Sequence, residues 1–206
     1  MKHGTSVSRL ESIQQNGLQS NTQSNWSIVP SIGGFVYLTN QDFQAYFHAT
    51  RTAVRDNCDV GVILHLDVDD ANLYPDENYF VSDLATPSWE EMLRSQLEIL
   101  NSKDEWHDCL ISLGMVAHKG DIPSERIVSY EKFNIKDSPF CSFVNSPLGF
   151  DETFTLYQRL IHLGQFNKYK GLSDLEIVSK FSVVSANDDI ITIDFDGIKQ
   201  MIRMIK

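Results

Sequence analysis

The amino-acid sequence predicts an α+β fold with two packed, mainly antiparallel sheets and surrounding helices. Segments with helical hydrophobic spacing and segments typical of strands follow one another in a mixed order along the 206 residues. Tight turns separate the later strand segments, which favours antiparallel pairing over a doubly wound parallel sheet. We expect a core domain at 1–135 and a C-terminal α/β extension at 136–206 that packs on the same domain.

The first elements can be assigned from their end signals and hydrophobic spacing. A helix is expected to begin after an N-cap at Ser6 or Ser8 and to end at Gly17, and the polar stretch 19–27 reads as a loop. The β-rich run at 33–39 and the Val/Ile-rich run at 60–68 predict strands. Between them we expect a helix that is capped by Asn40 or Asp42.

The later elements are assigned in the same way. The acidic, proline-punctuated stretch 69–87 predicts a loop, and a helix over 89–100 is expected with Ser88 as N-cap and two glutamates in its first turn. Its apolar stripe is predicted to be core and consists of Trp89, Met92, Leu93, Leu97 and Leu100. The remaining expected elements are strands at 109–118, 126–135 and 190–195, and helices at 151–163, 173–181 and 197–205.

Charge and composition exclude several classes of protein. There are 17 basic and 28 acidic residues, so the formal net charge is −11, which argues against charge-driven binding to nucleic acids or anionic membranes. No apolar run approaches the ~20 residues of a membrane-spanning helix. No apolar stretch follows Lys2, so we expect no secretory signal and a cytoplasmic protein, with signal-free export left open. The three separated cysteines predict buried thiols.

General catalytic motifs give no assignment. The sequence lacks a phosphate-binding GxxxxGK[ST] loop, a GxGxxG run after a strand, an HExxH pair and a GxSxG turn. The six histidines lack the spacing of metal ligands, so we expect no metal.

The first 70 residues carry an ordered set of motifs. These are His-Gly-Thr at 3–5, the spacing of Leu10, Ile13 and Gly17-Leu18, the run Val-Tyr-Leu-Thr at 36–39, and a helix with Ala45 and His48. Together they resemble the ADP-ribosyltransferase family, in the branch with a histidine and a tyrosine that includes diphtheria-toxin-like and poly-ADP-ribose-polymerase-like enzymes. The set is also similar to RNA 2′-phosphotransferases. The resemblance covers roughly 2–68, with weaker agreement across 110–135, and implies that NAD binds between the sheets as a substrate.

The resemblance implies a role for each residue of the first motif. His3 would bind ribose hydroxyls, because imidazole offers a donor and an acceptor at a fixed distance. Gly4 would let the backbone approach the nicotinamide amide, which a Cβ would obstruct. Thr5 would support the ribose or His3. The alternative for His3 is a solvated side chain near the chain terminus.

Further along the chain, the resemblance implies that Tyr37 stacks on the nicotinamide ring. His48 would take the place of the family's second aromatic residue, and Arg51 would contact a phosphate through its fork of donors. Tyr37 can instead be a packing residue of a half-buried strand. His48 can be a boundary histidine, and Arg51 a solvated helix charge.

The third motif of the family departs from the usual pattern. Transferases of this family usually carry a glutamate that stabilises the developing ribosyl cation, and its position corresponds here to Gly114 or Met115. A shifted register would supply Glu125 instead. Without that carboxylate, the resemblance implies transfer of a single ADP-ribose rather than synthesis of a polymer.

The function predicted by the resemblance is that of an NAD-dependent mono-ADP-ribosyltransferase. It would move ADP-ribose to a protein or nucleic acid acceptor and release nicotinamide, as in a toxin, an effector or a phage-conflict protein with a neutralising partner protein. An RNA 2′-phosphotransferase and an inactive module that binds NAD or ADP-ribose are the alternatives.

Overall fold

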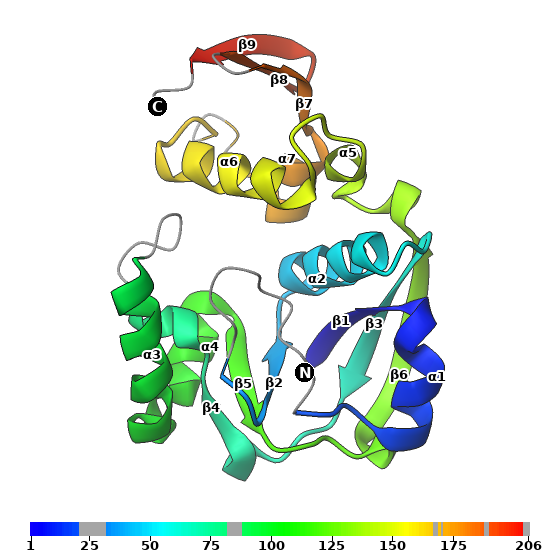
Figure 1. Cartoon of the computed structure of the whole chain (residues 1–206), viewed down its shortest axis with the longest axis vertical. Helices are drawn as coiled ribbons and strands as arrows, with labels where there is room; N and C mark the ends of the chain where they lie inside the picture. Colours follow the sequence, from blue (N-terminus) through cyan, green and yellow to red (C-terminus); the bar gives the residue numbers. More distant parts are fainter. Residues whose placement is uncertain (21–31, 82–87, 167–168, 170, 188–189, 204–206) are drawn as a thin grey trace.

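The computed structural model of this chain describes residues 1–20, 32–81, 88–166, 169, 171–187 and 190–203. They form a six-stranded sheet, a three-stranded sheet and helices that pack on both (Figure 1). The strand pairs of both sheets are antiparallel. The predicted α+β class and the preference for antiparallel pairing are therefore confirmed.

The six-stranded sheet has the strand order β4-β5-β2-β1-β3-β6. Its strands are β1 (Lys2–Ser6), β2 (Phe35–Thr39), β3 (Val60–Leu66), β4 (Leu73–Pro75), β5 (Met115–Lys119) and β6 (Ile127–Asn134). The first residues of the chain thus form a central strand, between β2 and β3. Each residue of β1 therefore has a neighbouring strand on either side.

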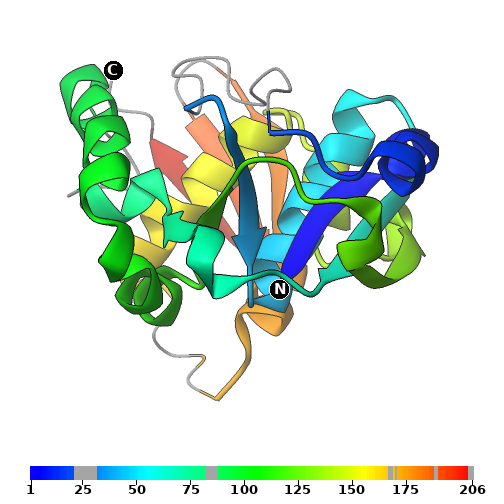
Figure 2. The same ribbon diagram turned by 90° about the horizontal axis from the view of Figure 1, so that it is seen from below.

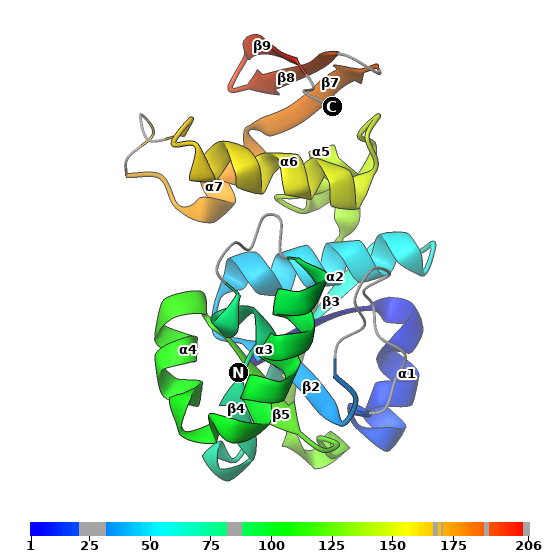
Figure 3. The ribbon, with the colours of Figure 1, turned by 60° about the vertical axis from the view of Figure 1, so that its left-hand side comes forward.

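Helices cover both faces of this sheet. They are α1 (Val7–Asn16), α2 (Asp42–Arg55), α3 (Trp89–Asn101) and α4 (Trp106–Leu113). Leu10 and Ile13 of α1 pack with the apolar side chains of one face, whereas α2 places Ala45 and Ala49 on Ile63 of the other. The two small alanines allow α2 to lie close to the strands. Helices α3 and α4 pack beside β4 and β5 (Figure 3).

Short 3-10 helices connect these elements. They are η1 (Asp70–Asn72), η2 (Glu77–Phe80), η3 (Lys103–Glu105), η4 (Ser124–Arg126) and η5 (Ile135–Asp137). Two of them matter for the candidate site. Helix η2 directly follows β4, and η4 lies between β5 and β6 and packs beside α1.

The C-terminal part has its own aromatic core. Its elements are α5 (Cys141–Val144), α6 (Phe150–His162), α7 (Asp174–Ser179), β7 (Phe181–Ala186), β8 (Ile190–Phe195) and β9 (Ile198–Arg203). Phe154 of α6 stacks on Phe47 of α2, with 3.9 Å between ring centroids. Helices α2 and α6 therefore lie between the two sheets (Figure 1). The two sheets thus pack on each other through these helices, whose aromatic residues fill the space between them.

Several predicted elements are confirmed at their ends. Ser6 is the N-cap of α1, and Gly17 ends that helix with φ 74°. Ser88 caps α3 and forms a capping box with Glu91. Strands β2, β3, β6 and β8 and helix α6 lie where the hydrophobic spacing placed them. The prediction of Asn40 or Asp42 as the N-cap of α2 is wrong, because Gln41 is the N-cap and Asp42 is the first residue of the helix.

In the described part of the segment 197–205, where a helix is predicted, Ile198–Arg203 form a strand, β9. It forms a hairpin with β8 through Asp196 and Gly197, which have φ values of 53° and 82°. Two consecutive residues with positive φ match the twist of antiparallel strands, and Asp-Gly adopts that conformation readily. The helix predicted over 173–181 ends at Ser179, and β7 begins at Phe181. At 196–197, the conformational preference of the Asp-Gly turn thus determined the structure, and the helical spacing of the apolar residues after it did not.

The strand predicted at 109–118 begins later than expected. Residues 106–113 form α4, Gly114 takes a left-handed conformation with φ 70°, and only then does β5 begin. The predicted loop 69–87 contains strand β4 in its described part. β4 completes the edge of the sheet beside β5. Residues 21–27 of the first expected loop and 82–87 of the second lie outside the described residues.

The predicted core stripe of α3 is also wrong in part. Leu93, Leu97 and Leu100 are 43%, 65% and 48% exposed, whereas Ser95 and Ile99 are fully buried. The helix packs on η2 and β4 through the face that carries Ser95 and Ile99. All three cysteines are free, but among them only Cys109 is buried, while Cys58 and Cys141 are half-buried.

Candidate functional site

The centre of the six-stranded sheet is split between β1 and β2. The two strands pair at Lys2 and Thr39, whereas β1 pairs with β3 along its whole length. From the shared end the strands diverge (Figure 2). His3 and the residues after it therefore face an edge of β2 that is not bridged by ladder hydrogen bonds, which leaves room there for side-chain contacts.

His3 bridges the beginning of this split with its side chain. Its Nδ1 lies 3.0 Å from the backbone carbonyl oxygen of Tyr37. A carbonyl oxygen can only accept, so Nδ1 donates the hydrogen, and Nε2 of the neutral ring carries the free lone pair. Burial lowers the pKa of the His3 imidazole below its usual value, which favours this neutral form at pH 7. His3 thus presents a fixed hydrogen-bond acceptor.

The strand register places neighbouring side chains on opposite faces of the sheet. His3 and Thr5 pair with Leu64 and Val62, which belong to the core under α1. Gly4 pairs with Ile63 and faces α2. Thr5 is 2% exposed, so its side chain lies in the packed interior on the same face of β1 as that of His3.

Gly4 is in close contact with α2. An added Cβ would lie 2.5 Å from the backbone nitrogen of Ala49 and in contact with the carbonyl oxygen of Ala45. It would also lie 3.0 Å from the Cβ of His48. The sequence-based interpretation assigned the close approach at Gly4 to a ligand, whereas in the structure helix α2 makes that approach. His48 is thereby held directly beside the first motif.

His48 is half-buried on α2, beside the backbone of Gly4. Burial is the main cause that lowers the pKa of His48 to about 3, and electrostatic repulsion from Arg51 and from the protonated form of His3 adds to it. The ring is therefore neutral at physiological pH and packs edge-on against Phe47 with a centroid distance of 5.0 Å. A neutral imidazole can offer a flat face to an aromatic ligand without the cost of placing a cation against it.

Tyr37 lies on the α2 face of β2 and contacts a carboxylate that sequence analysis missed. Its hydroxyl donates to Oε2 of Glu77 over 3.2 Å, and Glu77 is only 3% exposed. Glu77 begins η2, directly after the edge strand β4. In the sequence it is one of several acidic residues between 69 and 87, and nothing in that run separates it from solvated neighbours.

Arg51 is paired with a carboxylate of α6, and Glu125 lies beside α1. Nε and one Nη of Arg51 donate to the two carboxylate oxygens of Asp151 over 2.6 and 2.8 Å. This bidentate pair joins α2 to the first turn of α6, and the Arg51 side chain is 6% exposed. Glu125 is exposed in η4 beside α1. The side chain of Arg51 thus contacts Asp151, and Glu125 lies on a different element from His3.

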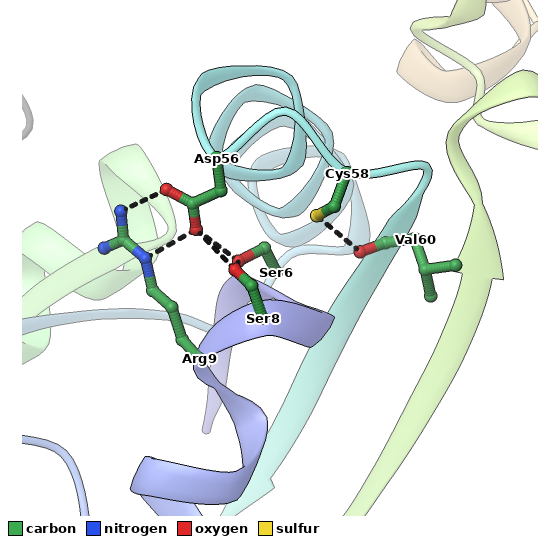
Figure 4. A network of polar contacts seen from close by, with 6 residues as sticks. All are labelled: Ser6, Ser8, Arg9, Asp56, Cys58 and Val60. Atoms are coloured by element: carbon green, nitrogen blue, oxygen red, sulfur yellow. Dashed lines mark hydrogen bonds and ion pairs between the residues drawn. The ribbon is translucent and has the colours of Figure 1, made fainter.

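A second polar network fixes the strand that carries His3. Asp56, at the C-terminal cap of α2, accepts hydrogen bonds from Ser6, Ser8 and Arg9 (Figure 4). Both Arg9 contacts measure 2.7 Å. These bonds, above all those of Arg9, lower the pKa of Asp56 to about 2. The network ties the end of β1 to the end of α2, the two elements that hold His3 and His48.

The network predicts a specific pH dependence of stability. The folded pKa of Asp56 lies below its ordinary value of 3.8, so the unfolded chain binds the proton more tightly. The stabilisation is therefore full above pH ~4 and disappears between pH ~4 and ~2, with a size of at most about 2 kcal/mol. Urea unfolding of wild type and Asp56→Asn should show a large difference in the free energy of unfolding at pH 7 and a small one at pH 2.5.

Arg9→Met serves as the matched control for this experiment, because it removes the cation and leaves the carboxylate in place. We expect its pH dependence to fall between those of wild type and Asp56→Asn. A difference between wild type and Asp56→Asn that is equal at both pH values would contradict the role assigned to the network.

In the described part of the chain, no cluster of three His, Cys, Asp or Glu side chains could hold a metal ion. The helices described here also include none with the length and apolar character needed to cross a membrane. Neither the models of known protein families nor the curated proteins compared with this chain give a match.

Proposed function

We propose that the protein is an NAD-dependent mono-ADP-ribosyltransferase. The observation that carries this proposal is the split between β1 and β2, where His3 is held against the backbone of Tyr37 with its Nε2 as an acceptor. The motifs that resemble the transferase family supply the identity of the substrate. His48, packed beside Gly4, adds a neutral ring on the α2 face of the sheet, the face on which the side chain of Tyr37 also lies.

The proposed reaction transfers ADP-ribose from NAD to a nucleophile on a protein or nucleic acid. His3 accepts a hydrogen bond from a hydroxyl of the nicotinamide ribose and fixes the sugar. Tyr37 and His48 provide flat surfaces for the nicotinamide ring. The bond between the ribose carbon and the pyridinium nitrogen breaks, its electron pair stays on nicotinamide, and the acceptor bonds to the ribose carbon and loses a proton. Catalysis rests on positioning and on electrostatic stabilisation.

An inactive module that binds NAD or ADP-ribose is the second candidate function. It is favoured by Met115, which stands at the beginning of β5 where the resemblance expects a glutamate. The RNA 2′-phosphotransferase alternative has less support. Arg51, the candidate phosphate ligand, is engaged with Asp151, and the net charge of −11 opposes a broad RNA surface.

Labelled NAD distinguishes these functions. The protein is incubated with a cell lysate and NAD that carries the label in its ADP-ribose part, and the products are treated with protease or nuclease. Label retained on protein or nucleic acid, with release of nicotinamide, supports transfer. Binding of NAD without nicotinamide release supports the inactive module, and loss of the 2′-phosphate from RNA supports the phosphotransferase. Observed transfer would also support a role as a toxin or effector with a neutralising partner protein.

A further inference from the structure

The contact between Tyr37 and Glu77 is the feature that the proposed reaction leaves without a role. The tyrosine hydroxyl donates to a carboxylate oxygen over 3.2 Å, and Glu77 is buried while Tyr37 stays partly exposed. β4 and β5 bring the two residues together: Tyr37 and Tyr74 both pair with Ala117, and Glu77 follows three residues after Tyr74. The carboxylate thus reaches Tyr37 from the edge of the sheet.

A buried carboxylate changes what the tyrosine ring can bind. The face of an aromatic ring already carries partial negative charge and attracts cations. Donation of the hydroxyl hydrogen to an anion draws electron density into the ring. The negative charge of Glu77 also acts over a short distance through a poorly screening interior. Both effects favour a planar cation over a neutral ring of the same shape.

We propose that Tyr37 and Glu77 form a subsite selective for a planar aromatic cation. This inference rests on the proposed function for the identity of the ligand, which is then the positively charged pyridinium ring of oxidised NAD. Glu77 acts through Tyr37 and is a specificity-determining residue. Breakage of the bond to ribose turns the pyridinium into neutral nicotinamide, so the subsite holds the substrate more tightly than the departing product.

The adjacent acidic residue provides a matched control. Asp76 is also 3% exposed, but its Oδ1 accepts from the backbone and side-chain nitrogens of Asn78, each over 2.8 Å. Its carboxylate therefore caps the beginning of η2. Asp76→Asn removes a second buried carboxylate from the same segment, one whose pKa is raised by burial, without touching the hydroxyl of Tyr37.

The test compares the cation N1-methylnicotinamide with neutral nicotinamide by calorimetry on the whole chain. We expect wild type to bind the cation about tenfold more tightly. Glu77→Gln keeps an oxygen acceptor and the side-chain volume but removes the charge. It should lower the affinity for the cation about five- to tenfold and change that for nicotinamide by less than about twofold. Asp76→Asn should keep the wild-type preference.

A second variant covers a failure of Glu77→Gln to fold. Tyr37→Phe retains the ring and the carboxylate but removes the hydroxyl between them, and it too should reduce the preference for the cation. Equal affinities for the two compounds in wild type, or an unchanged preference in the folded variants, would overturn the inference. An equal loss of preference in Asp76→Asn would overturn it as well, because the effect would then be one of general charge.

The experiment separates this inference from the proposed function. If wild type transfers ADP-ribose but shows no preference for the cation, the subsite is wrong and the transferase stands. If wild type prefers the cation in a manner that depends on Glu77 but neither binds nor consumes NAD, the subsite stands and the transferase is wrong.

Discussion

His3→Ala is expected to lower the rate of NAD-dependent labelling at least about a hundredfold, because the variant lacks the acceptor that fixes the ribose. The fold should survive the change. The lost side-chain hydrogen bond to Tyr37 is worth about 1 kcal/mol, which corresponds to about 2–4 °C in the melting temperature of a chain of this size. Initial labelling rates and thermal unfolding curves of the same preparations check both expectations.

His65→Ala is the matched control, because His65 is also a half-buried histidine on a neighbouring strand, β3. It should keep the wild-type labelling rate. His3→Gln retains an amide that can donate to the Tyr37 carbonyl, and it covers a failure of the alanine variant to fold. Wild-type labelling by folded His3→Ala would refute the role of the imidazole.

Gly4→Ala is expected to destabilise the fold by about 3 kcal/mol or more, which corresponds to a fall of about 6–12 °C in melting temperature. The added Cβ meets the backbone of α2 at Ala45 and Ala49, and backbone atoms cannot rotate away as a side chain can. Helix α2 must move off β1, and His48 moves with it. Urea unfolding gives the change in the free energy of unfolding.

Gly33→Ala provides the comparison for this prediction. Gly33 is exposed, and a Cβ there would have no atom within 4 Å. Its substitution should change the free energy of unfolding by less than about 0.5 kcal/mol. Equal stabilities of the two alanine variants would mean that α2 does not press on β1.

Local sequence signals predicted the elements whose ends are set by local chemistry. Ser6 and Gly17 bound α1, and Ser88 with Glu91 begins α3, because caps act within one turn of a helix. The errors at 109–118 and 197–205 came from short apolar runs, which fit a helix and a strand equally well. At Gly114 and at Asp196-Gly197, the backbone conformation decided between them.

The candidate site was predicted in part. The order of the motifs predicted a site shared by His3 and Tyr37, and in the structure the contact between these residues is made by the Tyr37 carbonyl. Arg51 was read as a phosphate ligand, because nothing near it in the sequence announces Asp151, which lies 100 residues further on. Glu77 was missed for the same reason.

The sequence by itself determined the α+β class, both ends of α1 and the beginning of α3, because periodicity and capping depend on neighbours a few residues away. Only the tertiary structure decided which charges are buried and paired. It put Glu77 under the hydroxyl of Tyr37, Asp151 on Arg51 and α2 on Gly4. Burial and ion pairing arise from segments that meet after the chain has folded, so no local pattern specifies them.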